Sequence, residues 1–392
     1  MSSSLEAKAA AKPHPLSTAA LKFGLSPDEF FWRDHQTWLA DSGYMLRSRY
    51  RLDWEPSWLK SKKDPFECED AHSLLASKAR FECLNVTNVS KQIVIMDAIR
   101  ISDGRVVALK RVPKSTYPFE EELNRFLTIS EPQAGDPHNH SVPVYDILQS
   151  PLDEDIVLLV MPYLIRIDEL KFSTIGEAVE CFRQLFEGLQ FLHRHHIAHL
   201  DIHRNNIMMD PTPVFSYIPH PTHSYKSYDF KHSISTRTRT SHPTKYFYID
   251  FGFSWRLPPD DPFPRVGLDV GADKSVPEYE DRQGRHDPFK VDIYCLGNTI
   301  RQYFMDKSYS LEFLRPIITE MVQQDPVKRP SIDKAFEQFE QLRASVSPWT
   351  LRSRMVYQDE LPLGRLYRGC RHAVRTAFWM ATGKPALPNP DA

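Results

Sequence analysis

The sequence has little cysteine, no long apolar run and no excess of one charge. Its five cysteines are odd in number and none stands in a C-x-x-C pair, which argues against a disulfide scaffold or a structural zinc site. No run of about 18 apolar residues occurs, so we expect no membrane span, and residues 1–15 lack the apolar core of a secretory signal. The formal net charge of −2 provides no basic field for nucleic acid. We therefore expect a cytoplasmic or nuclear protein without a nucleic-acid partner.

Glycine is also scarce, with 14 among 392 residues, and none lies between Asn85 and Ser102. The composition is otherwise that of a globular protein, with 41% hydrophobic and 26% charged residues. The length predicts two domains, or one two-lobed domain with extensions.

The most informative stretch is residues 199–206, HLDIHRNN, which reads H-x-D-x-x-x-x-N. It places two oxygen-bearing side chains, Asp201 and Asn206, five positions apart. Phosphoryl transfer uses such a pair, because a carboxylate orients and accepts the proton of the attacking hydroxyl while an amide oxygen holds a metal ion on the phosphates. A second carboxylate, Asp250, opens the triplet Asp-Phe-Gly after the strand-like run 246–249. Oxygen ligands of this kind suit Mg²⁺.

Further pieces occur in a fixed order around these two motifs. They are Val106-Val107-Ala108-Leu109-Lys110, Val276-Pro277-Glu278, the run 292–297 (DIYCLG) and the run 325–330 (DPVKRP). Together the set resembles the eukaryotic protein kinase superfamily, as a divergent, fungal-type kinase-like protein, over roughly residues 80 to 345. The resemblance implies an α+β, two-lobed protein kinase fold.

The implied organisation has three parts. Residues 1–79 are an aromatic-rich, partly helical extension, similar to leaders that precede kinase-like domains in some fungal families. Residues 80–345 are the kinase-like domain, with a β-rich N-lobe at about 80–161, a helical C-lobe at about 165–345 and a loop insert at 210–245. Residues 346–392 form a basic extension.

The resemblance also assigns roles to single residues. Asp201 and Lys110 are the expected catalytic residues, Lys110 through contact with the α- and β-phosphates of ATP. Glu122, in a helix expected at 119–127, is the expected partner of Lys110, and the alternative is that it lies in a solvated acidic helix start. Met161 and Leu164 are expected at the adenine-binding hinge.

The remaining ligands follow from the two acidic motifs. Asn206 and Asp250 are expected to bind nucleotide through Mg²⁺. Glu278 is expected to pair with Arg329, and Asp292 to hold the backbone of the 199–206 loop; these three are structural. The implied function is ATP-dependent phosphorylation of a protein, with Ser or Thr as the acceptor.

One departure from the family concerns the glycine-rich loop that covers the phosphates. Aligning the strands puts Asn88, Ser90 and Ile93 where the family has three glycines. Two alternatives therefore stay open. One is a pseudokinase scaffold that binds partner proteins, and the other is a small-molecule phosphotransferase, which the Pro-Glu element at 277–278 argues against.

Three segments are candidate partner sites, each with a plainer alternative. The aromatic leader could instead pack against the kinase-like domain. The Pro-, Ser- and Thr-rich insert at 210–245 is expected to be a surface loop, either a docking or phosphorylation segment or an idle insertion. The tail could form an amphipathic basic helix for an acidic partner or a membrane surface, or a solvated helix packed on the large lobe.

Overall fold

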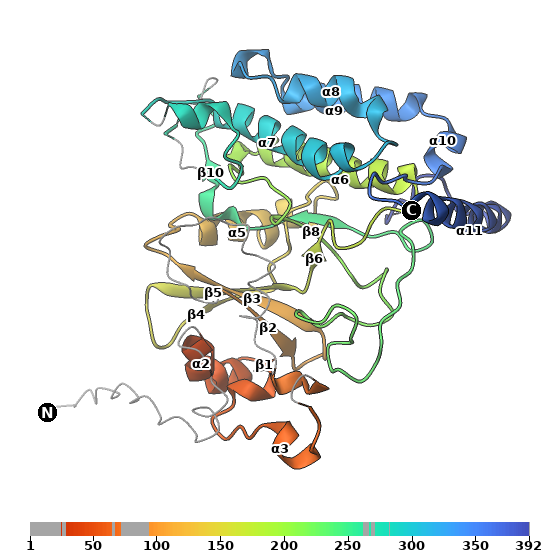
Figure 1. The fold of residues 1–392 in the computed structure, drawn as a ribbon. Coiled ribbons are helices and arrows are strands. Elements are labelled where there is room, and N and C mark those ends of the chain that lie inside the picture. The colour runs from red at the N-terminus through yellow and green to blue at the C-terminus, as the bar shows by residue number, and fades with distance from the viewer. Residues whose placement is uncertain are drawn as a thin grey trace, which may run out of the picture. The chain divides into compact units, whose positions relative to one another are not determined.

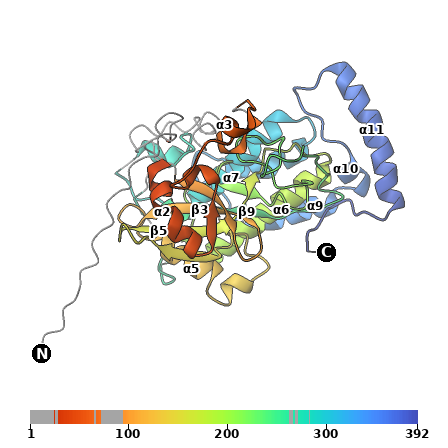
Figure 2. The same ribbon diagram turned by 90° about the horizontal axis from the view of Figure 1, so that it is seen from below.

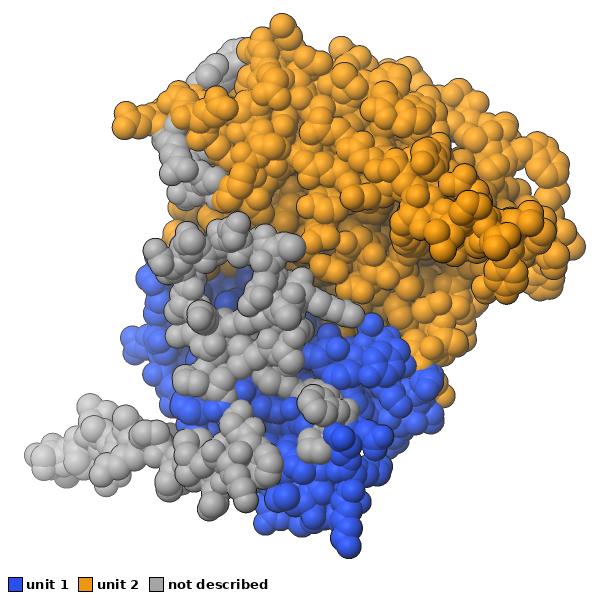
Figure 3. Space-filling view, viewed as in Figure 1, with its two compact units in different colours: residues 1–116, 145–162, 220–233 blue, residues 117–144, 163–219, 234–392 orange. Residues whose placement is uncertain are grey.

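The computed structural model divides the chain into two compact units (Figure 3). Unit 1 comprises residues 1–116, 145–162 and 220–233, and unit 2 comprises residues 117–144, 163–219 and 234–392. The residues that the structure describes are 25, 29–64, 67–71, 94–261, 266–267, 271–281 and 283–391. Unit 1 is rich in strands and unit 2 in helices, which confirms the predicted α+β class (Figure 1).

Unit 1 is built on a five-stranded antiparallel sheet with the strand order β1-β2-β3-β5-β4. Its strands are β1 (Tyr44–Leu46), β2 (Ile95–Arg100), β3 (Val106–Pro113), β4 (Asp146–Gln149) and β5 (Ile156–Pro162). The β2–β3 hairpin turns through Gly104, whose φ of +71° is the conformation that its Asp-Gly pair predicts. Strand β5 lies between β3 and β4, and its apolar run is buried on both faces.

The aromatic leader packs on this sheet. Helix α2 (Phe30–Asp41) contributes Trp32 and Leu39, each 0% exposed, to a core that also contains Met96 and Leu158. A short helix, α3 (Ser57–Ser61), follows. Because Trp32, Tyr50 and Trp54 of the leader are buried in unit 1, the structure favours the packing alternative over a partner site.

Part of the insert also belongs to unit 1. The Tyr228 hydroxyl donates to Asp97 Oδ2 at 2.6 Å, and Arg47 Nη2 lies 3.1 Å from Asp97 Oδ1. His220 is 1% exposed, and burial together with Arg47 lowers its pKa to about 3. Residues 220–233 therefore contribute to a buried polar network in unit 1, while Ser224, Tyr225 and Lys231 of the same segment are exposed.

Unit 2 is predominantly helical. Its helices are α5 (Glu120–Thr128), α6 (Ile175–Arg194), α7 (Pro288–Tyr303), α8 (Arg315–Met321), α9 (Ile332–Ser345), α10 (Pro348–Arg352) and α11 (Pro362–Ala381). Its short strands are β6 (Ile165–Arg166), β7 (Ile197–Ala198), β8 (Ile207–Met209), β9 (Tyr246–Tyr248) and β10 (Trp255–Arg256). Strands β6, β8 and β9 form one antiparallel sheet, and β7 pairs with β10. In the described residues, no helix is long and apolar enough to cross a membrane.

Helix α6 is the central helix of this core. It begins where the Thr174 hydroxyl caps it by accepting from Glu177 N, and Phe182, Leu185 and Leu189 on it are fully buried. Phe186 stacks on Phe339 of α9, with 4.8 Å between ring centroids.

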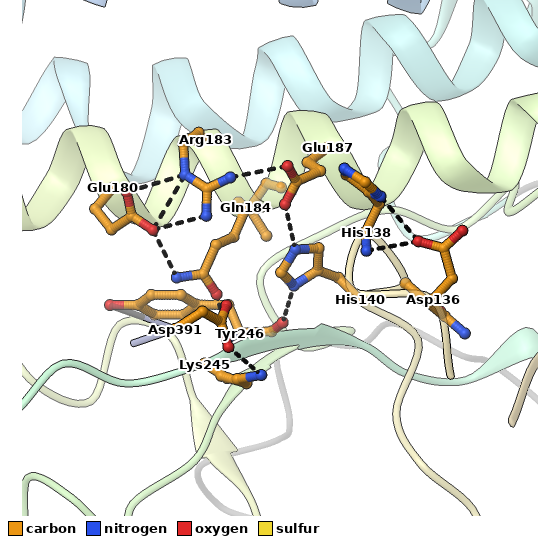
Figure 4. Close-up of polar contacts among 12 residues, drawn as sticks. Asp136, His138, His140, Glu180, Arg183, Gln184, Glu187, Lys245, Tyr246 and Asp391 are labelled. Carbon is orange, nitrogen blue, oxygen red and sulfur yellow. Dashed lines mark hydrogen bonds and ion pairs between the residues drawn. The ribbon is translucent and has the colours of Figure 1, made fainter. Parts of the chain in front are cut away.

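Polar side chains on α6 and nearby hold strand β9 (Figure 4). Gln184 accepts from Tyr246 N at 3.0 Å and donates to Thr244 O at 3.3 Å. His140 lies between Tyr246 O and a carboxylate oxygen of Glu187, at 3.2 and 2.9 Å. Buried polar groups need such partners, so this network positions the strand that leads into Asp250.

Candidate active site

The loop at 199–206 connects β7 to β8, and a side chain of helix α7 holds its backbone. Asp292 is fully buried, and its two carboxylate oxygens accept from His199 N at 2.8 Å and Leu200 N at 2.7 Å. His193 Nε2 lies 3.0 Å from the same carboxylate. Leu200 has a φ of +64°, a conformation that is rare for a branched side chain and that these bonds stabilise. Asp292 thus has the structural contacts predicted for it.

His199 is a packed residue of this loop rather than a proton-transfer group. Asp201 N donates to His199 Nδ1 at 3.3 Å, so Nε2 carries the proton and donates to Ile249 O at 3.1 Å. The ring centroid lies 5.1 Å from that of Phe251. Both ring nitrogens are therefore engaged in hydrogen bonds within the loop and with Ile249 O.

Asp201 is held by two hydrogen-bond donors. Asn206 Nδ2 donates to Asp201 Oδ2 at 2.9 Å, and Ala272 N donates to Asp201 Oδ1 at 2.7 Å. Burial raises the pKa of Asp201, and the nearby Asp250 adds to this effect, while His203 and the bond from Ala272 oppose it. Each oxygen keeps a further lone pair, so the carboxylate can accept a proton from a hydroxyl group.

Asn206 and Asp250 lie at the same end of the β8–β9 ladder. Ile207 pairs with Tyr248, and beyond that pair Ile249 N donates to Asn206 O at 3.0 Å. Asp250 follows directly with a φ of +65°, and its Oδ1 accepts from Gly252 N at 3.3 Å. The antiparallel register therefore brings together the two predicted metal ligands, although they are 44 positions apart in the sequence.

Asn206 and Asp250 suit Mg²⁺ that is bound together with a nucleotide, rather than a metal ion that is bound by protein side chains alone. Among the residues that the structure describes, no cluster of three or more His, Cys, Asp or Glu could hold a metal ion. Mg²⁺ is commonly bound by one or two oxygen side chains together with waters and the phosphates of a nucleotide. Because Asn206 Nδ2 donates twice to Asp201, its Oδ1 is the atom able to act as a ligand beside Asp250.

The contact from Ala272 was missed by sequence reasoning. A Cβ atom added to Gly271 would lie 3.0 Å from Asp201 Oδ1 and 2.9 Å from the Tyr279 hydroxyl, so only glycine fits here without a shift. The signal in the sequence was a glycine a few residues before the Pro-Glu element at 277–278.

Helix α5 carries a buried carboxylate, but not the predicted one. Glu122 is exposed, whereas Glu120 is 1% exposed and lies on the buried face with Leu123 and Leu127. Glu122 therefore lacks the buried environment that its predicted role requires, and Glu120 has it. The i, i+3, i+7 spacing of Glu120, Leu123 and Leu127 was the signal that could have found it.

The remaining predicted nucleotide-binding residues are placed within their own units. Lys110, in β3, is 6% exposed, and Met161, in β5, is 7% exposed; both belong to unit 1. Leu164, in unit 2, is half-buried just after the chain leaves unit 1. Their roles stay predictions. The positions aligned with the family's glycines lie outside the described residues: Asn88, Ser90 and Ile93.

The predicted ion pair of the large helical unit is present. Arg329 Nη1 and Nη2 donate to Glu278 Oε1 and Oε2 at 2.6 and 2.9 Å, with side-chain exposures of 0% and 2%. Arg329 also donates to the carbonyls of Gln323 and Lys290, so its donors are well satisfied.

Comparison with known proteins agrees with this geometry. Residues 92–263 match the family model of the protein kinase domain. The match identifies a protein kinase domain within the chain, and a domain of this class uses ATP and a divalent metal ion.

Individual relatives are distant. The human NUAK family SNF1-like kinase 2 is 26% identical over 117 residues, which are 28% of this chain and 18% of that protein. The putative ribosomal protein S6 kinase alpha-2 of Caenorhabditis elegans is 28% identical over 152 residues, 36% of this chain and 19% of that protein. The chain thus spans less than a fifth of the length of these relatives.

Proposed function

We propose that this protein transfers the γ-phosphoryl group of ATP to a serine or threonine hydroxyl of a protein substrate. The observation that carries the proposal is the Asp201 carboxylate, 11% exposed and oriented by Asn206 and Ala272 next to the Asn206–Asp250 oxygen pair. The names of the relatives, which include an SNF1-like kinase and a ribosomal protein S6 kinase, support a protein acceptor.

ATP with Mg²⁺ supplies the phosphoryl group and neutralises charge on the phosphates when it is bound. In this proposal Asn206 Oδ1 and Asp250 hold the metal ion. Asp201 orients the acceptor hydroxyl and takes its proton, which the raised pKa of the carboxylate favours. Lys110 keeps its predicted role on the α- and β-phosphates.

The test is phosphoryl transfer to a degenerate Ser/Thr peptide library, with autophosphorylation followed by mass spectrometry. Asp201→Asn should abolish transfer while ATP binding stays close to that of the wild type, because only the proton acceptor is lost. Asp333→Asn, at an exposed carboxylate on the surface of the same unit, is the control and should transfer normally. Transfer that survives Asp201→Asn would remove Asp201 from the proposed role.

A second candidate function is a pseudokinase scaffold. It is favoured by one observation, the absence of glycine between Asn85 and Ser102. Measuring the ATP affinity of the wild type and of Lys110→Ala distinguishes the kinase from the scaffold. A nucleotide site that uses this lysine should lose affinity for ATP, whereas a scaffold that does not bind ATP should show no ATP binding in either form.

A further inference from the structure

Helix α11 presents its apolar face to solvent. Leu363, Val374 and Phe378 are 83%, 74% and 64% exposed, and their spacing places them on one side of the helix with Leu366 and Tyr367. The opposite side carries the two buried residues of the helix, His372 and Trp379. Figure 2 shows α11 at the periphery of the helices of its unit, apart from α6 and α9. An exposed apolar face of this length indicates an interaction site.

The charge of α11 is of one sign. The helix carries four arginines and no acidic residue: Arg365, Arg368, Arg371 and Arg375. Among the described residues, Arg368 is the arginine of α11 that forms an ion pair, with its Nε 3.5 Å from Glu360 Oε2, and Glu177 acts on Arg375 at longer range. Arg375 Nε is buried without a hydrogen-bond partner in the described part of the chain. Burial lowers the pKa of Arg375, Glu177 opposes this shift, and Arg371 lowers the pKa further, so an anion beside the two arginines would be stabilised.

A cavity of about 310 Å³ lies along this flank of α11. Its cationic lining residues are Lys171, Arg354, Arg368, Arg371 and Arg375. Two carboxylates also line it, and both are already paired, Asp359 with Lys171 and Glu360 with Arg354. The surplus positive charge on Arg371 and Arg375 therefore faces a space large enough for a phosphate group.

We propose that α11 binds the surface of an anionic phospholipid membrane, with its apolar face at the boundary of headgroups and acyl chains. Arg371 and Arg375, on the flank of that face, then contact lipid phosphates. A bilayer complements both features of α11. Its apolar layer can contact the apolar face along the roughly 30 Å of this 20-residue helix, and its anionic headgroups provide the negative charge that the arginines require. This inference does not depend on the proposed kinase activity.

The experiment is flotation of the full chain with vesicles of phosphatidylcholine that contain phosphatidylserine, against vesicles of phosphatidylcholine alone. The chain should float with the anionic vesicles only. Val374→Ser with Phe378→Ser should reduce the bound fraction by about tenfold or more, because two exposed apolar side chains no longer enter the interface. The matched control is Val327→Ser, at a residue that is 83% exposed elsewhere in the same unit, and it should bind as the wild type does.

The charged part is tested separately. Arg371→Gln should weaken binding to the anionic vesicles, while Lys328→Gln, at an exposed lysine next to the control position, should not. Circular dichroism of each variant confirms that the helices are retained. Failure of the wild type to bind anionic vesicles, or equal binding by the Val374/Phe378 variant, would overturn the proposal. A dimer in the absence of vesicles that this variant dissociates would also overturn it, since the face would then be an interface between two copies.

Discussion

The ion pair of Glu278 and Arg329 offers a quantitative test of how the helical unit is stabilised. Replacing Glu278 by Gln keeps the shape of the side chain but leaves the buried guanidinium without its counter-charge. Breaking one partner of such a pair costs about 3–5 kcal/mol. Because Arg329 keeps its bonds to the carbonyls of Gln323 and Lys290, at 2.7 and 2.8 Å, we expect a value near the lower end, about 3 kcal/mol.

Such a loss corresponds to a fall in melting temperature of roughly 6–12 °C at about 2–4 °C per kcal/mol. The assay is thermal unfolding followed by circular dichroism or calorimetry. The chain provides a matched control in Glu312 and Arg315, a pair with two bonds of 2.6 Å whose side chains are more than half exposed. Glu312→Gln should leave the melting temperature unchanged. If both variants melt at the same temperature, burial is not what makes the first pair strong, and the reasoning is refuted.

Three further predictions follow from the buried polar groups. Asp292→Ala should destabilise the fold by about 1–3 kcal/mol for each buried amide left without an acceptor, as measured by urea unfolding. Because burial raises the pKa of Asp201 above its ordinary 3.8, the proposed transfer should fall as pH drops through that raised pKa; a pH profile of kcat with its acid limb at or below 3.8 would contradict this. Tyr228→Phe should destabilise unit 1 by about 1.5–3 kcal/mol, since Asp97 loses a charged hydrogen bond. Tyr225→Phe, at a tyrosine that is 64% exposed, is its control in the same unfolding assay.

Patterns of residue type and spacing predicted much of the helical unit. Apolar residues recur at helical spacing from Ala178 to Leu192, so the amphipathic periodicity of α6 is visible in the sequence. The order of the short motifs along the chain predicted the Asp201 loop. The roles of Asp292, Glu278 and Arg329 could be predicted as well, because each residue belongs to a motif with a fixed place in that order.

What the sequence could not show depends on tertiary contacts. The choice between Glu120 and Glu122 is a difference of about half a helical turn, and only the buried face of α5 decides it. The packing of His220 and Tyr228 in unit 1 was hidden because a Pro- and Ser-rich segment resembles a surface loop. The outward orientation of the apolar face of α11 was hidden too, since periodicity gives two faces but not which one meets the protein.

The central claim is that the Asp201 loop and its Asn206–Asp250 oxygen pair form a magnesium-dependent nucleotide site. The most direct measurement is the melting temperature of the purified chain with ATP, in the presence and absence of Mg²⁺. A ligand at about 100 times its Kd adds about 2.7 kcal/mol, so the account predicts a rise of roughly 5–11 °C that requires Mg²⁺ and that Asp250→Ala removes. No rise at millimolar ATP with or without Mg²⁺ would contradict the account and leave the scaffold as the better reading.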